Sequence, residues 1–242
     1  MKLILLAAGK SSRIFSKINI NKCLIKINKK SLIKNIIDNA YNSGIKHIEI
    51  VSGFKSKNIE KDLKNYNVTF IKNIKYETTD MVYSSILSLE RSKTDVIICY
   101  TDIIFEKNIF ESLINNKKTN IIVPHLRNWK NVWKLRKKNI FEDAETFLTN
   151  KNNNKVIEIG KKIKKKKLKK ITGQFMGIIY IPKKMIKFVI KKYKYCNKKK
   201  VQFTEFLNFL ISQKIEIDTF PYKGLWYEFD DFQDLKSYKK LK

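Results

Sequence analysis

Short apolar runs alternate with amphipathic helical segments through the first half of this chain, and this alternation limits the possible folds more than any other feature. Runs of this length, rich in Ile, Val and Leu, are typical of strands buried inside a sheet. The predicted strands are Leu3–Ala7, Ile48–Val51, Val68–Ile71, Val96–Tyr100 and Ile121–Val123. The predicted helices are a segment from Leu32 to Ala40 with Ser31 as its N-cap and Gly44 as its stop, then Ile59–Leu63, Asp80–Leu89 and Ile109–Leu113. We therefore predict an α/β fold, a mostly parallel mixed sheet with helices on both faces.

The second half of the chain is less regular. Strands are predicted at 132–141, 155–160, 174–181 and Ile215–Phe220, with helices at Met185–Tyr193, Phe203–Ile211 and from Phe232 onward. Lys/Asn-rich turns separate the first three strands, which favours a small antiparallel addition to the sheet. Neither a long linker nor an internal repeat interrupts the 242 residues, so we predict a single domain over 1–242.

Charge is the unusual property of the composition. The 52 Lys+Arg against 22 Asp+Glu give a net charge of +30, which raises nucleic acid as a partner. However, the excess consists of lysine and accompanies many Asn and Ile residues, as in 150–155 and in 161–170. We expect the Lys-rich run 161–170 to lie at the top of a hairpin or in a surface loop. These residue types share A- and T-rich codons, and arginine, the better phosphate fork, is scarce. We favour a solvated lysine surface with no specific nucleic-acid partner, although salt-dependent non-specific binding is expected.

The cysteines and the apolar segments indicate a reduced, cytoplasmic protein. Cys23, Cys99 and Cys196 are odd in number and widely spaced, which disfavours a disulfide framework and a zinc site. The apolar N-terminal run is too short for a signal peptide, and we expect no membrane span.

The turn after the first strand is the first feature that carries chemistry. It reads Leu6-Ala7-Ala8-Gly9-Lys10-Ser11-Ser12-Arg13, in which small residues let backbone N–H groups approach a polyphosphate and Arg13 adds charge. The spacing fits neither a Walker loop nor a GxGxxG motif. Nine residues further on, Lys22 stands in an apolar context before the next helix.

This front motif, together with later blocks, resembles the nucleotidyltransferases of the CTP:phosphocholine cytidylyltransferase and 2-aminoethylphosphonate cytidylyltransferase group. The later blocks follow in order to the end of the chain: VSGF (51–54), TTDMVYSSI (78–86), YTDIIF (100–105), W-x3-W-x2-R (129–136), EDAE (142–145), IG-K (159–161), GQFMG (173–177), TEFLNFLI (204–211) and WYEFD (226–230). Each block alone is weak, but an ordered set over nearly the whole length is specific. The resemblance implies a Rossmann-like fold of the glycosyltransferase-A type.

The resemblance also implies a reaction and its residues. CMP would pass from CTP to a phosphate or phosphonate oxygen with release of pyrophosphate, so the site needs cations and positioning more than a nucleophile. Arg13 and Lys22 match the residues that contact the triphosphate, and Asp102 and Asp230 match a pair that holds Mg²⁺. Glu228 and Asp231 compete with Asp230 for that role. His47 and His125 are interpreted as bystanders.

Nucleotide binding is expected from the first turn and two later segments. The expected residues are Leu6, Ala7, Ala8, Gly9, Ser11, Ser12, Gly53, Thr79, Asp80 and Ser84. The sequence departs from the family pattern at Asp80, where Asn is usual, at Thr101, where many members have Gly, and at Ile74, where Pro is frequent. An Asp in place of Asn lacks a donor, which puts the cytosine contacts in doubt.

The acceptor is expected to be a small phospho- or phosphono-amine bound by the half 126–242, with CTP in the half 1–125. Aromatic faces and a carboxylate suit an ammonium group, and an arginine fork suits its phosphate. The expected residues are Tyr83, Trp129, Trp133, Phe175, Trp226 and Glu228, with Glu145 or Asp143 as counter-charge and Arg136 as the fork. Trp and Phe are also common core residues, so each aromatic has a purely structural alternative. Phosphocholine is the favoured acceptor, and 2-aminoethylphosphonate, phosphoethanolamine and a sugar-1-phosphate are the alternatives. The enzyme would act as a monomer or a homodimer.

Overall fold

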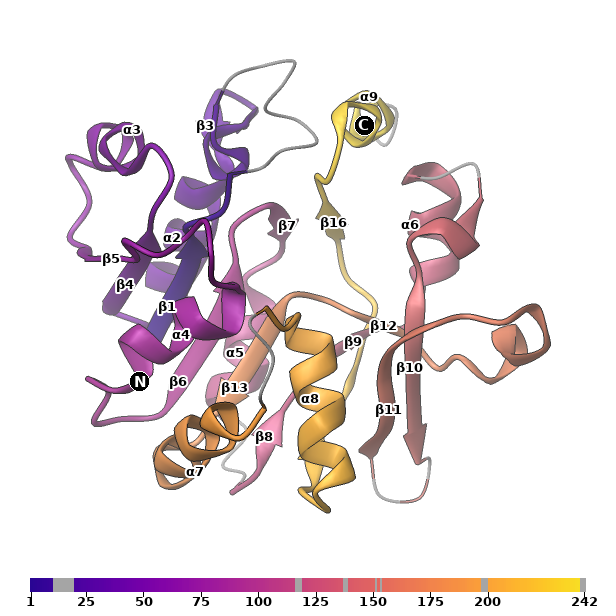
Figure 1. The fold of residues 1–242 in the computed structure, drawn as a ribbon. Coiled ribbons are helices and arrows are strands. Elements are labelled where there is room, and N and C mark those ends of the chain that lie inside the picture. The colour runs from indigo at the N-terminus through magenta and orange to yellow at the C-terminus, as the bar shows by residue number, and fades with distance from the viewer. Residues whose placement is uncertain are drawn as a thin grey trace.

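The computed structural model is built around a nine-stranded mixed sheet, which Figure 1 shows with its flanking helices. The structure describes residues 1–10, 20–115, 119–136, 139–150, 152, 154–196 and 200–239. The strand order is β10-β11-β14-β8-β13-β6-β1-β4-β5. At its centre, β1 (Lys2–Ala7) pairs in parallel with β4 (His47–Ser52) and β6 (Val96–Tyr100), and β5 (Thr69–Lys72) continues the parallel part.

The helices cover both faces of the sheet, as predicted. Leu3 and Leu5 of β1 pack in one apolar cluster with α2 (Leu32–Asn42), α3 (Ser56–Asp62) and α5 (Asn108–Asn115). Ile4 and Leu6 pack in the opposite cluster with α4 (Met81–Leu89), α7 (Lys183–Lys194) and α8 (Phe203–Ser212). Because successive side chains of a strand point to opposite faces, a strand with helices on both sides must be apolar throughout. All six residues of β1 are buried.

The predicted antiparallel addition is present in the second half of the chain. β13 (Ile178–Ile181) runs antiparallel to β6, and β10 (Glu145–Asn150) forms an antiparallel pair with β11 (Lys155–Lys162). β8 (Ile121–Ile122) and β14 (Ile217–Asp218) link these parts. Three small sheets complete the described strands: β7 (Ile103–Phe105) with β16 (Trp226–Glu228); β9 (His125–Leu126) with β12 (Gln174–Phe175) and β15 (Pro221–Tyr222); and β2 (Lys26–Ile27) with β3 (Lys30–Ser31).

The prediction of a strand at 132–141 is wrong. This segment belongs to α6 (Trp129–Arg136) and the 3₁₀ helix η2 (Ile140–Glu142). The buried residues of α6 are Trp129, Trp133 and Arg136, whose spacing of four and three places them on one helical face. That face packs against α9 (Phe232–Tyr238), the predicted terminal helix. The strand β10 was not predicted.

The remaining short helices are η1 (Lys22–Leu24) and η3 (Lys165–Lys170), the latter in the Lys-rich run. Ser31 and Gly44 flank α2 as predicted, and Gly44 has the left-handed φ of 84° that ends many helices. The Ser31 hydroxyl, however, donates to Asp62 at 2.7 Å instead of capping the helix backbone.

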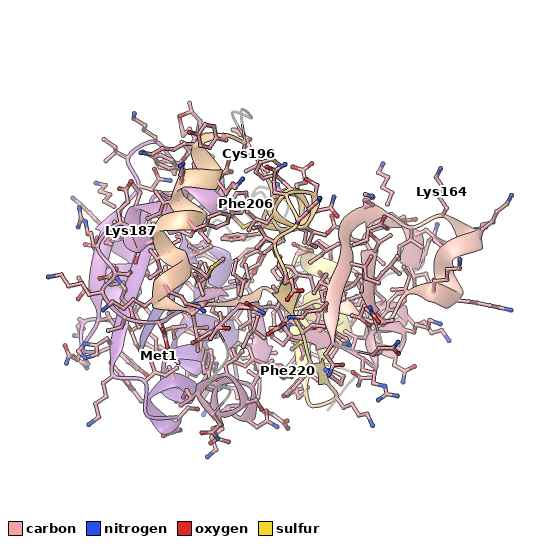
Figure 2. The ribbon with its side chains drawn as sticks, turned by 90° about the horizontal axis from the view of Figure 1, so that it is seen from below. Met1, Lys164, Lys187, Cys196, Phe206 and Phe220 are labelled. Carbon is pink, nitrogen blue, oxygen red and sulfur yellow. The ribbon has the colours of Figure 1, made fainter. Side chains whose placement is uncertain are left out.

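The lysines are spread around the molecule. Figure 2 shows nitrogen-tipped side chains along most of the outline, with Lys164 and Lys187 on opposite sides. A spread of this kind is what a compositional origin of the +30 charge predicts, whereas a nucleic-acid surface gathers its lysines on one face. Within the described part of the chain, the structure has no helix with the length and apolarity needed to cross a bilayer.

Candidate active site

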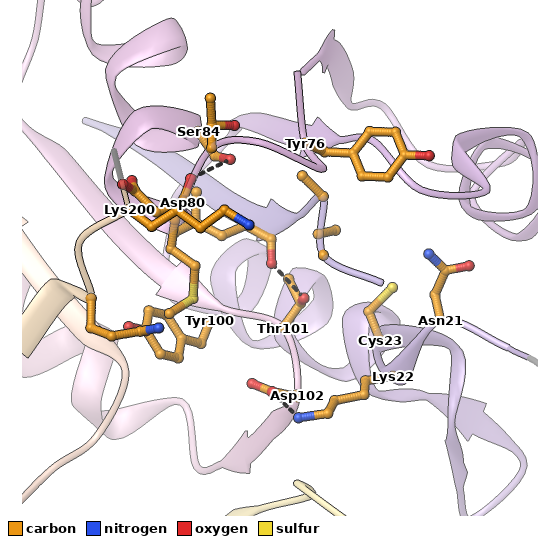
Figure 3. Close-up of a pocket in the computed structure, with 17 residues that line it drawn as sticks. Asn21, Lys22, Cys23, Tyr76, Asp80, Ser84, Tyr100, Thr101, Asp102 and Lys200 are labelled. Atoms are coloured by element: carbon orange, nitrogen blue, oxygen red, sulfur yellow. Dashed lines mark hydrogen bonds and ion pairs between the residues drawn. The ribbon is translucent and has the colours of Figure 1, made fainter. Parts of the chain in front are cut away.

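The carboxyl ends of β1, β4 and β6 meet at one edge of the sheet, toward the top of Figure 1. Two contacts join the segments that leave these strands: the amide of Phe54 donates to the Ala8 carbonyl at 3.1 Å, and the Thr101 hydroxyl donates to the Leu6 carbonyl at 2.7 Å. A pocket of about 310 Å³ opens at this edge (Figure 3). Ligands of open α/β sheets bind in the crevice at this end of the strands.

Most of the predicted nucleotide-binding residues line this pocket: Leu6, Ala7, Ala8, Gly9, Thr79, Asp80 and Ser84. Gly53 lies behind it, where a side chain would meet the Ala8 carbonyl at 2.8 Å and the Tyr76 side chain at 2.7 Å. Only glycine therefore allows the two segments to approach this closely. The predicted Ser11, Ser12 and Arg13 lie outside the described residues.

Lys22, at the start of η1, is the cation of the pocket nearest to the predicted metal ligands. Its ammonium nitrogen lies 2.8 Å from Oδ1 of Asp230 and 3.1 Å from Oδ2 of Asp102, and Figure 3 shows it pointing toward Asp102. Burial alone would lower the pKa of Lys22, but Asp102 and Asp230 outweigh it and raise the pKa above its ordinary value. Lys22 is therefore a fixed positive charge in the lining of the pocket.

A strand pairing brings the predicted carboxylates together. Asp102 follows β6, and β16 pairs antiparallel with β7 so that Glu228 stands opposite Ile103. The amide of Phe229 then donates to the Asp102 carbonyl at 2.9 Å. As a result, ligand oxygens of Asp102, Glu228 and Asp230 all lie within 4.8 Å of one another.

Within the part of the chain that the structure describes, carboxylates outnumber cations in this cluster. Ion pairs join Asp102 and Asp230 to Lys22, and Asp143, Glu228, Asp230 and Asp234 to Arg136. Burial and then the nearby Asp230 raise the pKa of Glu228 well above its ordinary value. A set of hard oxygen donors this close together fits a divalent cation such as Mg²⁺, held by Asp102 and Asp230 with Glu228 beside them.

The structure places Arg136 away from the role of phosphate fork that we predicted. Its side chain is completely buried and its guanidinium faces Glu228, Asp230 and Asp234 at 3.1, 3.1 and 3.3 Å. Trp133 lies under the guanidinium, whose central carbon is 4.9 Å from the ring centroid. An acceptor phosphate could not reach this group without displacing its carboxylate partners.

The three tryptophans predicted as walls of an amine site are core residues. Trp129, Trp133 and Trp226 expose no more than 4% of their surface. The Trp133 and Trp226 rings stack with an angle of 3° and a centroid distance of 5.7 Å, and Trp129 meets Trp133 edge-on. The structural alternative is therefore the correct one for all three rings, because their faces are covered by each other.

Three other predicted acceptor residues, Phe175, Glu145 and Glu228, lie near Tyr100, which lines the pocket. Phe175 meets the Tyr100 ring edge-on at 5.7 Å. Burial raises the pKa of Tyr100, and the carboxylates of Asp102, Glu228, Glu145 and Asp230 add to this effect. Glu145 thus lies within electrostatic reach of Tyr100. Its own pKa is raised by burial, which a hydrogen bond with Thr204 partly offsets.

Asp80, the departure from the family pattern, has a clear structural role. As N-cap of α4, its Oδ1 accepts from the amide of Tyr83 at 2.7 Å, and its Oδ2 accepts from the amide of Val201 at 2.7 Å. Both oxygens are therefore used to tie α4 to the segment that carries Lys200 and Gln202, which also line the pocket. Tyr83 itself lies in the first turn of α4 and is not part of the pocket lining.

Several residues of the site were not predicted. Asn21, Tyr76, Lys200 and Gln202 line the pocket, and no motif distinguished them. Asp234, which is completely buried beside Arg136, sits at the third position of α9, where a capping box with Asp231 could have been found in the sequence. His125 is buried against Thr219, with Nδ1 2.7 Å from the hydroxyl, and does not line the pocket.

Comparison with known proteins identifies the family. Residues 3–167 match the family described as the MobA-like NTP transferase domain. This chain belongs to that family. The predicted resemblance to nucleotidyltransferases is thereby confirmed, and the pocket lies within the part of an NTP transferase where parallel strands end.

A curated relative extends over the whole length of this NTP transferase. The CTP:phosphoglutamine cytidylyltransferase of Campylobacter jejuni is 30% identical over 253 aligned residues, which cover 98% of each chain. The match therefore includes the segments 168–242 beyond the family model, with Glu228 and Asp230.

Two solved structures share the fold. The inositol-1-phosphate CTP transferase of Thermotoga maritima superposes with a TM-score of 0.80 and 19% identity, covering 98% of this chain and 93% of its own. The CTP:phosphocholine cytidylyltransferase of Streptococcus pneumoniae superposes with a TM-score of 0.76 and 20% identity, covering 99% and 98%. The predicted fold class is confirmed, including the antiparallel addition.

Proposed function

We propose that this NTP transferase is a cytidylyltransferase, which transfers CMP from CTP to a small phosphorylated acceptor. A phosphate oxygen of the acceptor attacks the α-phosphorus of CTP, the bond from that phosphorus to the oxygen bridging to the β-phosphorus breaks, and pyrophosphate leaves. The observation that carries this proposal is that Lys22, held by Asp102 and Asp230, lines the same pocket as the turn formed by residues 7–9. The full-length relative that acts with CTP supports the choice of nucleotide.

Lys22 would supply positive charge to the triphosphate, and the turn at Ala8 and Gly9 would supply backbone N–H groups. Such fixed donors stabilise the charge that develops on the phosphate oxygens, and they need no reorganisation during the reaction. Thr79, Asp80 and Ser84 lie at the opposite wall, where the nucleoside would fit. As in the prediction from the sequence, Arg13 is proposed to place a second positive charge beside the triphosphate.

Asp102 and Asp230, with Glu228 close by, are the residues proposed to hold Mg²⁺. When bound, this ion would neutralise negative charge on the triphosphate. Two carboxylates on one side of the pocket and an anionic substrate on the other would otherwise repel each other, so the residues fit the ion better than they fit a bare nucleotide.

The acceptor proposed here is a phosphorylated amino compound, and two observations bear on the choice among such compounds. The sequence favoured phosphocholine, whose quaternary ammonium needs exposed aromatic faces. Trp129, Trp133 and Trp226 are not available for this purpose. We therefore place phosphoglutamine, the acceptor named for the full-length relative, before phosphocholine. Glu145 is the carboxylate proposed to face the acceptor's ammonium.

A two-way substrate panel tests the proposal. The purified enzyme is incubated with Mg²⁺ and each of CTP, UTP, ATP and GTP, against phosphoglutamine, phosphocholine, phosphoethanolamine, 2-aminoethylphosphonate and inositol-1-phosphate. Pyrophosphate release and the mass of the product are measured. We expect turnover with CTP and a phosphorylated amine, with phosphoglutamine giving the highest kcat/KM. Turnover only with UTP or with a non-amine acceptor would contradict the proposal.

A further inference from the structure

Arg136 contacts the carboxylate cluster described above and is completely buried, with no exposed side-chain surface. It reaches the cluster from α6, whereas its partners Glu228, Asp230 and Asp234 come from β16, the turn after it and α9. A buried guanidinium is stable only when carboxylates compensate it, and a buried carboxylate cluster likewise requires the cation. The two parts therefore depend on each other.

The contacts of Arg136 determine how Asp230 is oriented. Nη2 of Arg136 lies 3.1 Å from Oδ2 of Asp230, on the side opposite the pocket cation. The other oxygen, Oδ1, lies 2.8 Å from the ammonium of Lys22. Since one oxygen is held by the guanidinium, rotation of the carboxylate is restricted and Oδ1 stays directed toward Lys22 and Asp102.

Arg136 also fixes the backbone beneath Asp230, through Asp234. Nε of Arg136 lies 3.3 Å from Oδ1 of Asp234. The Oδ2 atom of the same carboxylate accepts from the amides of Asp230 at 2.7 Å and Asp231 at 3.1 Å. Both the side chain and the main chain of residue 230 are thus connected to one guanidinium.

The plane of the guanidinium is itself set by aromatic rings. Its central carbon lies 4.9 Å from the Trp133 centroid and 6.0 Å from the Tyr227 centroid. Trp133 precedes Arg136 by one helical turn and stacks on Trp226 of β16. Trp133, which was predicted to bind an amine, therefore supports this arginine, with Trp226 stacked on its ring.

We propose that Arg136 is a positioning residue that holds Asp230 and Glu228 in the geometry needed to bind the divalent cation; this inference rests on the proposed function. Its side chain is not part of the lining of the pocket. Without the guanidinium, Glu228 and Asp230 would repel each other and Asp230 would turn away from Asp102. Loss of a residue that orients metal ligands typically weakens metal affinity by about 10- to 100-fold.

The test compares wild type with Arg136→Lys and Arg136→Met, and with Arg91→Met as a control at an exposed arginine. Mn²⁺ binding without nucleotide is measured by electron paramagnetic resonance, and CMP transfer is titrated with Mg²⁺. Both are done at a temperature where thermal melting shows each variant to be folded. Arg136→Lys keeps the buried charge but has no fork, so it decides the question if Arg136→Met does not fold.

We expect a Mn²⁺ affinity at least about tenfold lower in Arg136→Met, an intermediate loss in Arg136→Lys, and the same losses in the Mg²⁺ titration. The control should match wild type. If Arg136 were purely structural, its substitution would lower the melting temperature but leave the Mn²⁺ affinity and the Mg²⁺ dependence of CMP transfer unchanged. That result, with CMP transfer by wild type intact, would overturn the inference. If wild type transfers no nucleotide at all, the proposed function fails, and the inference fails with it.

Discussion

The ammonium of Lys22 lies 2.8 Å from Oδ1 of Asp230, although 208 residues separate the two in the chain. The contact exists because η1 follows the first strand of the sheet while β16 adds to β7 directly after Asp102. The site thus combines the first turn of the fold with its last strand. Lys22 belongs to the half 1–125 and Asp230 to the half 126–242, so each half supplies one charge of the ion pair.

Lys22→Met tests the position of this charge. The substitution keeps the length of the side chain but removes the ammonium, so we expect kcat/KM for CTP to fall by about 100-fold or more. Steady-state kinetics with varied CTP measures this. The control is Lys165→Met, at an exposed lysine of η3; if both variants lost activity equally, net charge and not position would govern nucleotide binding.

Glu145→Gln tests the acceptor side. Glutamine keeps the size and hydrogen-bonding reach of the side chain but removes the charge proposed to face the ammonium. We expect KM for the acceptor to rise by a factor equivalent to about 1–3 kcal/mol, with KM for CTP nearly unchanged. Kinetics with each substrate varied in turn gives both constants, and Glu216→Gln, at an exposed glutamate, is the control. A loss confined to CTP would assign Glu145 to the nucleotide site.

Asp80→Asn tests the structural role of this departure from the family pattern. Asn has one acceptor oxygen, so the amide of Tyr83 or that of Val201 would lose its partner and face an NH₂ group. We expect the free energy of unfolding in urea to fall by about 1–2 kcal/mol. An unchanged or higher stability would show that the two contacts are not both made in solution.

His125 predicts a pH dependence of folding. Burial, and then nearby Arg127, lower the pKa of His125 to about 4. Between about pH 6.5 and about pH 4, the unfolded chain therefore binds a proton that the folded chain excludes, so stability falls as the pH falls. The free energy of unfolding falls by about 3 kcal/mol in total, and this fall is complete below about pH 4.

His125→Gln should remove this part of the slope, since glutamine does not titrate but can still hydrogen-bond Thr219. The measurement is urea unfolding from about pH 7 to about pH 4, with His47→Gln at an exposed histidine as control. If the free energy of unfolding had the same pH dependence in wild type and His125→Gln, the folded chain would bind a proton at His125 as readily as the unfolded chain does, which would contradict this prediction.

The sheet and its helices could be predicted because their signals are local. Each of the strands around β1 is a short apolar run, and α2 shows apolar residues at helical spacing. The same kind of spacing is present at Trp129, Trp133 and Arg136, but one of these three residues is charged and Val132 and Leu135 between them are apolar, so the helical pattern is obscured. The strand prediction therefore failed at a helix with only three buried residues.

The identities of the site residues were easier to predict than their roles. Lys22, Asp102 and Asp230 were named from motifs, and the structure brings them together. Arg136 was named as well, but its partners lie 94 and 98 residues away, so the sequence could not show that its guanidinium faces carboxylates. The sequence likewise could not show the role of the tryptophans. Their aromatic rings are of the type that binds an amine, but in the structure they stack on one another in the core.

The most direct test of the account is kcat for CMP transfer in Asp102→Asn, compared with Glu60→Gln as an exposed control. Asparagine keeps the shape of the side chain but removes one of the two charges that hold Lys22 and that are proposed to hold the metal ion. With an unchanged circular dichroism spectrum, we predict that kcat falls by about 100-fold or more while the control keeps wild-type turnover. A folded Asp102→Asn enzyme with near-wild-type kcat would contradict the assignment of this cluster as the active site.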